Sequence, residues 1–344
     1  MVIDANMYWF EEELFEDEGL SEAFLSEIPQ SYGTKGTLQT TANGARQIVI
    51  EKPSGYQNLN YVQGEYRLER MLADMDAAGV EQAILKMPGC QEWMSLATCK
   101  RFNDGMARYV QQSGGRLQAL AVLPPQGTAA CLAELDRCLA MGFKGVQLSA
   151  HYGKVYLDDP MFAPFFARLN ELALTVYVHH TPIPVNYESL LDYDNLRRSY
   201  GRCVDQATAI GRELFSGFFD RYPNLKFVHS MLGGAWFGIA QLMAPHKPGG
   251  AQSVARFSES GGTYEKRLAE NIFFETSHAQ PWGKKQLECA VEVLGADHII
   301  FGTSYPVRQE WLLGGPAFVR ALDITEQEKE NILFKNAQRL YHMK

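Results

Sequence analysis

The sequence predicts an α/β fold, a (β/α)₈ TIM barrel, because short apolar segments alternate regularly with amphipathic helical patterns along the chain. Eight apolar segments of four to seven residues have the composition of parallel strands that are buried on both faces. These predicted strands are Val2–Met7, Gln82–Met87, Leu117–Leu123, Gly145–Ala150, Val176–His179, Lys226–Ser230, Ile272–Thr276 and Ile299–Thr303. A doubly wound open sheet is the alternative fold. It is less favoured because no glycine-rich phosphate loop follows a strand.

Amphipathic patterns between these strands predict the helices. Apolar residues recur at helical spacing over Leu68–Met75, and Gly79 is expected to end that helix. Asp159 and Pro160 are residue types preferred at the N-cap and the first turn of a helix. Residues 325–328 have the sequence of a capping box, which predicts the start of the last helix.

A long segment, residues 10–64, separates the first predicted strand from its helix, where a few residues would be enough. It contains the acidic run Glu11–Glu18 and the hairpin-like stretch Gln39–Ile50, which has an Asn-Gly pair near its middle. In a single barrel domain spanning residues 1–344, this segment would form an extended, partly β loop at the C-terminal mouth. A lid over the mouth is one interpretation, and a loosely packed surface excursion is the other.

The composition is that of an ordinary globular protein, with 46% hydrophobic and 21% charged residues. A formal net charge of −8 argues against nucleic acids and anionic membranes as partners. No segment approaches the roughly 18 uninterrupted apolar residues of a membrane-spanning helix. The N-terminus lacks the pattern of a signal peptide, and the six cysteines include no Cys-x-x-Cys pair. We therefore expect reduced thiols and a cytoplasmic protein.

Polar residues gather where the predicted strands end, which is where barrels of this kind build their active sites. Five of the eight histidines lie there, namely His151, His179, His180, His229 and His278. Strand alternation predicts that His179 points inward together with Tyr177, and that Gln147, Ser149 and His151 share one face. A lone histidine is more often a structural polar residue. Five at one rim, on polar inward faces that are costly without partners, indicate a site.

Two further groups of residues could contact a substrate. Arg197, Arg198 and Arg202 follow the fifth strand and could bind a carboxylate, although a solvated helix face is the alternative for each. Four aromatic residues near strand ends could stack on an unsaturated substrate or serve only in packing; they are Trp9, Trp93, Tyr152 and Tyr305.

A glycine pair, Gly233-Gly234, follows the sixth predicted strand. It is not a dinucleotide fingerprint, because the spaced third glycine is missing. We expect the pair to begin a helix whose N-terminus could receive an anion.

An ordered set of segments carries a family resemblance over nearly the whole chain. These segments are Ile3-Asp4, residues 75–80, Asn103 with Met106-Ala107, residues 120–125, residues 142–146, Asp158-Asp159-Pro160, residues 222–226, residues 232–237, residues 301–306 and Asn336-Ala337 with Leu340. The chain resembles the amidohydrolase-related TIM barrels that include aminocarboxymuconate-semialdehyde decarboxylase and the resorcylate and carboxyvanillate decarboxylases. No single segment is diagnostic, but the ordered set is specific.

The resemblance implies a divalent metal, usually zinc, and four ligand positions at the strand ends. The paired ligands on strand one fall on Asn6 and Tyr8, and the aspartate of strand eight falls on Ser304. Only the strand-five ligand is kept, as His179, and the acid/base histidine of strand six is replaced by Met231. Asparagine, tyrosine and serine are poor ligands for such an ion, so we expect a site that works without metal and has no cofactor.

In this interpretation uncharged side chains handle the proton. We predict His179 as the acid/base, assisted by His151 or His180, with Tyr8 and Ser304 also in the catalytic set. The predicted substrate contacts are Asn6, Trp9, Gln147, His229, Glu275 and Arg198. His229 lies two residues before Met231, so it could replace the missing histidine only from deeper in the barrel.

The expected activity is that of a decarboxylase-like lyase or a hydrolase on a small carboxylated or oxygenated cyclic substrate. One alternative is a remodelled site for zinc or another divalent metal, assembled from His151, His180, His229 and Glu275. Another alternative is a non-catalytic barrel that binds a ligand. The expected partner is a small-molecule substrate, and likeness to the family suggests a homodimer.

Overall fold

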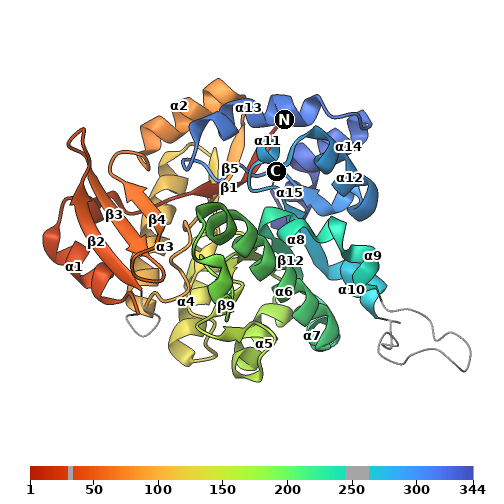
Figure 1. Ribbon diagram of the computed structural model, residues 1–344, viewed down its shortest axis with the longest axis horizontal. Coiled ribbons are helices and arrows are strands. Elements are labelled where there is room, and N and C mark those ends of the chain that lie inside the picture. The colour runs from red at the N-terminus through yellow and green to blue at the C-terminus, as the bar shows by residue number, and fades with distance from the viewer. Residues whose placement is uncertain (30–33, 245–262, 344) are drawn as a thin grey trace, which may run out of the picture.

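Eight strand positions close into a parallel barrel (Figure 1), so the predicted TIM-barrel fold is confirmed. The computed structural model describes residues 1–29, 34–244 and 263–343. The barrel strands are β1 (Ile3–Tyr8), β5 (Gln82–Lys86), β6 (Leu117–Ala119) with its continuation β7 (Ala121–Val122), β8 (Val146–Ser149), β11 (Thr175–His179), β12 (Lys226–His229), β13 (Ile272–Glu275) and β14 (Ile299–Ile300). The ring closes where the Ala5 amide donates to the Phe301 carbonyl at 3.0 Å.

The helices surround this barrel, as expected for βα units. They are α2 (Leu68–Ala78), α3 (Leu96–Gln112), α4 (Ala129–Ala140), α5 (Ala163–Glu171), α6 (Gly201–Phe215), α7 (Phe218–Arg221), α10 (Tyr264–Asn271), α11 (Ala279–Trp282), α12 (Lys284–Leu294), α13 (Gln309–Arg320), α14 (Glu326–Glu330) and α15 (Asn336–Tyr341), with α8 (Ser230–Ala235) and α9 (Ala240–Met243) after β12. Gly79 ends α2 in the left-handed conformation, and the predicted capping box of α14 is present. Asp159 caps a short 3₁₀ turn, Pro160–Phe162, instead of α5 itself.

The inner and outer faces of the strands divide the core into two layers. Aliphatic and aromatic side chains fill the barrel, and α15 covers their lower end; they are Ile3, Ala5, Ile84, Leu120, Tyr177, Val228, Phe273 and Ile300. Val176 and Val178 face the helices, as strand alternation predicts. The polar side chains of the strand ends are therefore held above an apolar floor.

The insertion before α2 is a packed subdomain. Its strands β2 (Lys35–Thr40), β3 (Arg46–Glu51) and β4 (Gln57–Val62) form an antiparallel sheet beside α1 (Glu18–Ser26), and the predicted hairpin is the β2–β3 pair. Tyr61 of β4 stacks on Phe10 at 4.2 Å, and its hydroxyl donates to the Pro88 carbonyl at 2.7 Å. This packing contradicts the alternative of a loose surface excursion.

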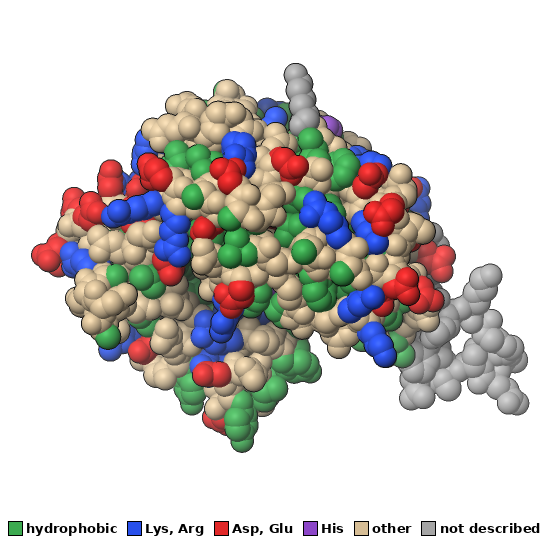
Figure 2. Space-filling model, turned by 90° about the horizontal axis from the view of Figure 1, so that it is seen from above, with side chains coloured by type: hydrophobic (Ala, Val, Ile, Leu, Met, Phe, Trp, Pro, Cys, Tyr) green, Lys and Arg blue, Asp and Glu red, His purple; other side chains and the backbone are tan. Residues whose placement is uncertain are grey.

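The surface has mixed charge. Figure 2 shows acidic and basic side chains interspersed over one face of the molecule. Within the described parts of the chain, no helix combines the length and the apolar character needed to cross a bilayer.

Candidate active site

Three strand ends bring a connected set of hydroxyl, amide and imidazole groups to the barrel mouth. The Tyr8 hydroxyl lies 2.9 Å from Nε2 of His179 and 3.4 Å from Oγ of Ser304. The Asn6 amide nitrogen donates to the same Ser304 oxygen at 3.0 Å. All four side chains are buried, so water does not compete for these contacts. The structure thus brings together the four positions at which the family resemblance implied metal ligands.

The direction of this hydrogen-bond chain follows from one contact. Nδ1 of His179 lies 2.6 Å from the backbone carbonyl of His180, and a carbonyl can only accept, so Nδ1 carries the proton. In the neutral ring Nε2 is then an acceptor, and it receives a hydrogen bond from the Tyr8 hydroxyl. Because Tyr8 has one proton, Ser304 is the donor in the remaining contact with it. The chain runs from Asn6 through Ser304 and Tyr8 to His179.

Burial keeps both ends of the key contact uncharged. It lowers the pKa of His179 to about 3, with Lys86 and Arg202 adding smaller electrostatic effects. Burial also raises the pKa of Tyr8 to about 12. Near neutral pH the pair is therefore a phenol and a neutral imidazole, and His179 is suited to orient the Tyr8 hydroxyl.

Glu275 lies beneath this chain and is fully occupied by donors. It accepts from the Tyr177 hydroxyl at 2.7 Å, from the Asn6 amide at 3.1 Å and from the Ser277 hydroxyl at 3.1 Å. Burial raises its pKa. Gly302 has no side chain because a Cβ there would lie 1.9 Å from a Glu275 carboxylate oxygen. Glu275 positions Asn6, since one of its carboxylate oxygens accepts from Asn6, Tyr177 and Ser277 together.

Arg202 of α6 is the cation that faces the mouth. Its guanidinium lies 3.3 Å from Oδ1 of Asn58 in the insertion, and its Nε is buried without a hydrogen-bond partner among the described residues. Burial lowers the pKa of Arg202 to about 10, with Arg198 as the next cause. The charge of Arg202 contributes to lowering the pKa values of both Tyr8 and His179. Arg198, the arginine predicted from the sequence, instead lines a shallow outer pocket of about 480 Å³.

His180 and His278 lie on the same side of the site. The His180 ring packs on His179 with centroids 4.1 Å apart, and its Nδ1 lies 3.1 Å from the Ser230 hydroxyl. His278 stacks on Trp311 at 4.3 Å. Burial lowers the pKa of His278 to about 4 and that of His180 well below its usual value. Both rings are therefore neutral near pH 7.

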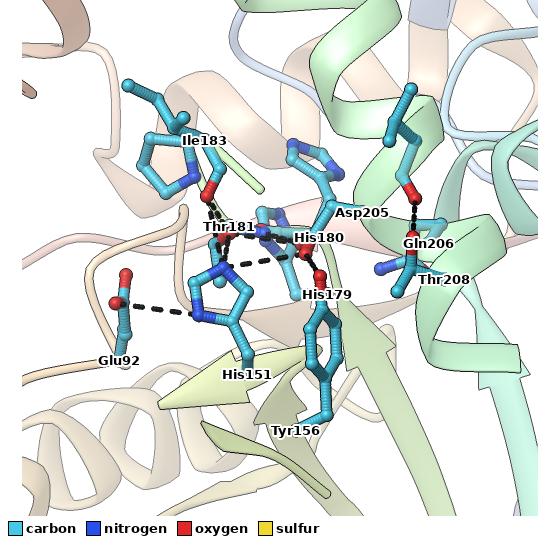
Figure 3. Close-up of polar contacts among 12 residues, drawn as sticks. Glu92, His151, Tyr156, His179, His180, Thr181, Ile183, Asp205, Gln206 and Thr208 are labelled. Atoms are coloured by element: carbon cyan, nitrogen blue, oxygen red, sulfur yellow. Dashed lines mark hydrogen bonds and ion pairs between the residues drawn. The ribbon is translucent and has the colours of Figure 1, made fainter. Parts of the chain in front are cut away.

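His151 belongs to a separate, ionic cluster (Figure 3). Its Nε2 lies 2.6 Å from the Thr181 hydroxyl and 3.4 Å from Asp205, and its Nδ1 faces Glu92 at 3.9 Å. Glu92 in turn accepts from Lys52 of the insertion at 2.7 Å. In the described chain no hydrogen bond joins His151 to His179, so the predicted assisting role of His151 is not supported by contact.

Three other predicted residues lie away from the chain. His229 points outward and contacts Gln206 and Glu213 of α6 at 2.8 and 2.9 Å, because Val228 takes the inward position of β12. The Trp9 ring packs against Gly105 of α3, where a Cβ would lie 2.0 Å from it. The side-chain amide of Gln147 is held by the backbone of Met87 through contacts of 2.7 and 2.8 Å. These placements correct the prediction that the three side chains contact a substrate.

The glycine pair also differs from its prediction. Residues 231–235 form a left-handed turn, with φ between 48° and 71° at every position. A Cβ at Gly234 would lie 1.9 Å from the Cys203 carbonyl of α6, so only glycine allows this close approach. The segment does not begin a right-handed helix with free amides, and the expected anion site at a helix N-terminus is wrong.

The residues at the mouth do not fit a divalent metal. The one good ligand among these four residues is Nε2 of His179, and it already accepts a hydrogen bond from the Tyr8 hydroxyl. The pKa of that hydroxyl is raised to about 12, so Tyr8 stays protonated and is a poor ligand. The proposed alternative set is also dispersed, since His229 faces α6 and Glu275 is held by its donors. Across residues 1–29, 34–244 and 263–343, no three His, Cys, Asp or Glu side chains are grouped to hold an ion.

Comparison with known proteins identifies the family. Residues 60–343 match the family described as Amidohydrolase. The chain belongs to the amidohydrolase family. The predicted resemblance is confirmed, and with it the prediction that the chain is an enzyme.

Curated relatives and solved structures agree with this amidohydrolase assignment. The gamma-resorcylate decarboxylase of Rhizobium sp. (strain MTP-10005) is 26% identical over 316 residues, covering 82% of this chain and 92% of that protein. The 2-amino-3-carboxymuconate-6-semialdehyde decarboxylase of Dictyostelium discoideum is 27% identical, covering 71% and 66%. The fold matches 5-carboxyvanillate decarboxylase of Novosphingobium aromaticivorans, solved with manganese and 4-hydroxy-3-methoxy-5-nitrobenzoic acid. Its TM-score is 0.74 at 21% identity, covering 100% of this chain and 96% of that one.

Sequence reasoning missed two cations of this amidohydrolase site. Arg202 was named with its neighbours but not preferred, because only the structure shows which arginine of the run faces inward. Lys86 was not considered, although it is fully buried at the end of β5. A lysine within an otherwise apolar predicted strand is the signal that could have identified it.

Proposed function

We propose that this chain is a decarboxylase for a small hydroxylated aromatic carboxylic acid, and that its proton chemistry needs no bound metal. The contact between the Tyr8 hydroxyl and Nε2 of His179 carries the proposal. The family resemblance makes this nitrogen a metal ligand, but here it accepts a hydrogen bond from Tyr8. The decarboxylase relatives support the reaction class.

Arg202 is proposed to bind the substrate carboxylate. A guanidinium can hold a carboxylate through two parallel hydrogen bonds, and Nε of Arg202 is a buried donor without a partner in the described structure. The charge of Arg202 also acts on Tyr8, where it opposes the rise in pKa that burial causes.

Tyr8 is proposed to deliver the proton to the ring carbon that bears the carboxylate. As that carbon gains the proton, its bond to the carboxyl carbon breaks, the electron pair of that bond returns to the ring, and carbon dioxide leaves. Water then reprotonates the Tyr8 phenolate. His179 acts as a positioning residue, because its fixed tautomer holds the hydroxyl in one direction.

The insertion is proposed to act as a lid over this site. Asn58, next to β4's first residue, is buried and donates to the Pro182 carbonyl at 3.3 Å, while Arg202 reaches its side chain. Leu59 and His179 both lie close to Gly89. These contacts place the insertion directly against the catalytic strands.

Turnover by protein that has been treated with a strong chelator tests the proposal. Purified enzyme would be dialysed against dipicolinate, analysed for zinc and manganese, and assayed for carbon dioxide release from 2,6-dihydroxybenzoate and related hydroxybenzoates. We expect unchanged turnover at a metal content well below one equivalent. Loss of turnover that returns with zinc or manganese would favour a remodelled metal site. Saturable binding without turnover of any acid would favour a non-catalytic barrel.

A further inference from the structure

Lys86 is a buried amine for which the proposed reaction has not yet required a role. It is the last residue of β5, its side chain is fully buried, and its Nζ has no hydrogen-bond partner in the described part of the chain. It forms no ion pair with Asp4 or Glu275, whose pKa values burial raises despite the opposing effect of Lys86. Leaving a buried donor unpaired costs about 1–3 kcal/mol, so the position requires an explanation.

The strand register places Lys86 beside the reacting groups. Lys86 pairs with Tyr8 across the parallel strands β5 and β1, and paired residues point to the same face of a sheet. Nζ lies 3.0 Å from the centre of the Tyr177 ring, and Tyr177 precedes His179 by two residues on the inward face of β11. The amine therefore faces the barrel interior, where it lies over the Tyr177 ring.

Two more buried polar atoms without a hydrogen-bond partner in the described structure belong to barrel strands, the Ser149 hydroxyl and Oδ1 of Asn6. Ser149 pairs with His179 in the register of β8 and β11, and its hydroxyl is buried without a partner in the described structure. Oδ1 of Asn6 is likewise buried and unpaired there, while its amide nitrogen serves Ser304 and Glu275. Strands β5, β8 and β1 thus present an amine, a hydroxyl and an amide oxygen to the barrel interior.

We propose that the Lys86 amine binds the ring hydroxyl oxygen of the substrate, with Ser149 as a second hydrogen-bonding group. This inference rests on the proposed function and names its substrate class more closely, as an aromatic acid with a hydroxyl next to the carboxylate. Arg202 holds the carboxylate from the mouth, and Lys86 holds the neighbouring oxygen from the barrel wall. Arg202 supplies the positive charge, whereas burial lowers the pKa of Lys86 well below its usual value and so favours the neutral amine, which can accept a proton.

The contact between Lys86 and the substrate hydroxyl allows a proton transfer that assists the decarboxylation. The phenolic proton passes to Lys86, and the electron pair of the resulting phenolate moves into the ring as the ring carbon takes the proton of Tyr8. The pair returns to the oxygen when carbon dioxide leaves, and the ammonium then returns the phenolic proton. No oxidant, reductant or further reactant is consumed.

Binding of two ligands to the full-length enzyme tests Lys86 without relying on turnover. Calorimetric titration would compare 2-hydroxybenzoate with benzoate, which lacks the ring hydroxyl. We expect the unmodified enzyme to prefer 2-hydroxybenzoate by at least roughly tenfold, the scale of one hydrogen bond to a charged group. Lys86→Met should lose this preference and keep its affinity for benzoate, while the exposed control Lys285→Met should behave like the unmodified enzyme.

Every outcome of this binding experiment either supports or overturns the role of Lys86. A Lys86→Met protein that keeps the preference, or that loses affinity equally for both ligands, would overturn the role of Lys86. If Lys86→Met does not fold, the unmodified enzyme decides, because equal affinity for the two ligands overturns the inference and a clear preference supports it. Failure of both ligands to bind the unmodified enzyme overturns the proposed function as well, whereas binding without preference counts against Lys86 alone.

Discussion

Two of the buried histidine clusters in the described structure, those of His179 and His151, differ in charge. Within the described residues, the hydrogen bonds of the His179 ring go to uncharged groups, the Tyr8 phenol and a backbone carbonyl. His151 lies between the carboxylates of Asp205 and Glu92, and Glu92 is paired with Lys52 of the insertion. We therefore expect a division of labour, in which the uncharged cluster serves the proposed proton transfer and the ionic cluster joins the insertion to the barrel.

Removal of the Tyr8 hydroxyl should have the largest effect on the uncharged cluster. Tyr8→Phe keeps the ring and deletes the proposed proton donor, so we expect kcat to fall roughly 1,000-fold, within the usual range for general acid catalysis. Steady-state kinetics with a hydroxybenzoate substrate would measure it. The exposed control Tyr200→Phe should match the unmodified enzyme. Retention of a tenth or more of the activity by Tyr8→Phe would remove Tyr8 from the mechanism.

Breaking the ionic cluster should reduce stability instead. Glu92→Gln removes the carboxylate that contacts the buried Lys52 ammonium at 2.7 Å, and breaking a buried ion pair costs about 3 kcal/mol. Urea unfolding would measure the loss, with the exposed Glu265→Gln as control. Folded Glu92→Gln protein should keep kcat within about threefold, since general acid catalysis is left intact. A fall in kcat as large as that of Tyr8→Phe would mean that the two clusters act as one.

Arg202 is expected to act mainly through substrate binding. Arg202→Met removes the proposed carboxylate contact, and loss of such a charged hydrogen bond predicts roughly a 30-fold decrease in kcat/KM. Most of the change should appear in KM, and the exposed Arg320→Met should show none. An effect confined to kcat would instead connect Arg202 to the charge on Tyr8.

The free energy of unfolding should depend on pH, because His278 is buried as a neutral ring. The folded pKa of His278 is about 4, below the usual value near 6.5, so the unfolded chain binds the extra proton. This contribution is complete above pH 6.5 and is lost as the pH falls toward 4, with a slope of at most about 1.4 kcal/mol per pH unit. His278→Gln should flatten the urea-unfolding stability profile over that interval, and the exposed His342→Gln should not.

The fold was predictable because a buried parallel strand has a distinctive sequence. Each predicted strand from Val2–Met7 to Ile299–Thr303 overlaps an observed one, although β14 is only two residues long and the third strand is interrupted at Leu120. The chain from Leu120 onward still bonds to both neighbouring strands, so the interruption leaves the barrel wall closed.

The site was predictable only where strand alternation holds to the end of a strand. Alternation correctly placed His179 inward, together with Tyr177. It could not place His229, because the chain turns left-handed directly after β12 and parity with Met231 is lost. Lys86 escaped notice because only the register of a closed barrel shows that its amine shares a face with Tyr8.

The left-handed turn at residues 231–235 has a practical consequence. Three of its five residues, Met231, Leu232 and Ala235, carry a Cβ in a conformation that costs about 1–2 kcal/mol for each such residue. Glycine at the least packed of these positions would therefore relieve backbone strain without changing any group that we assign to the chemistry. Engineering of a more stable variant could begin with that substitution.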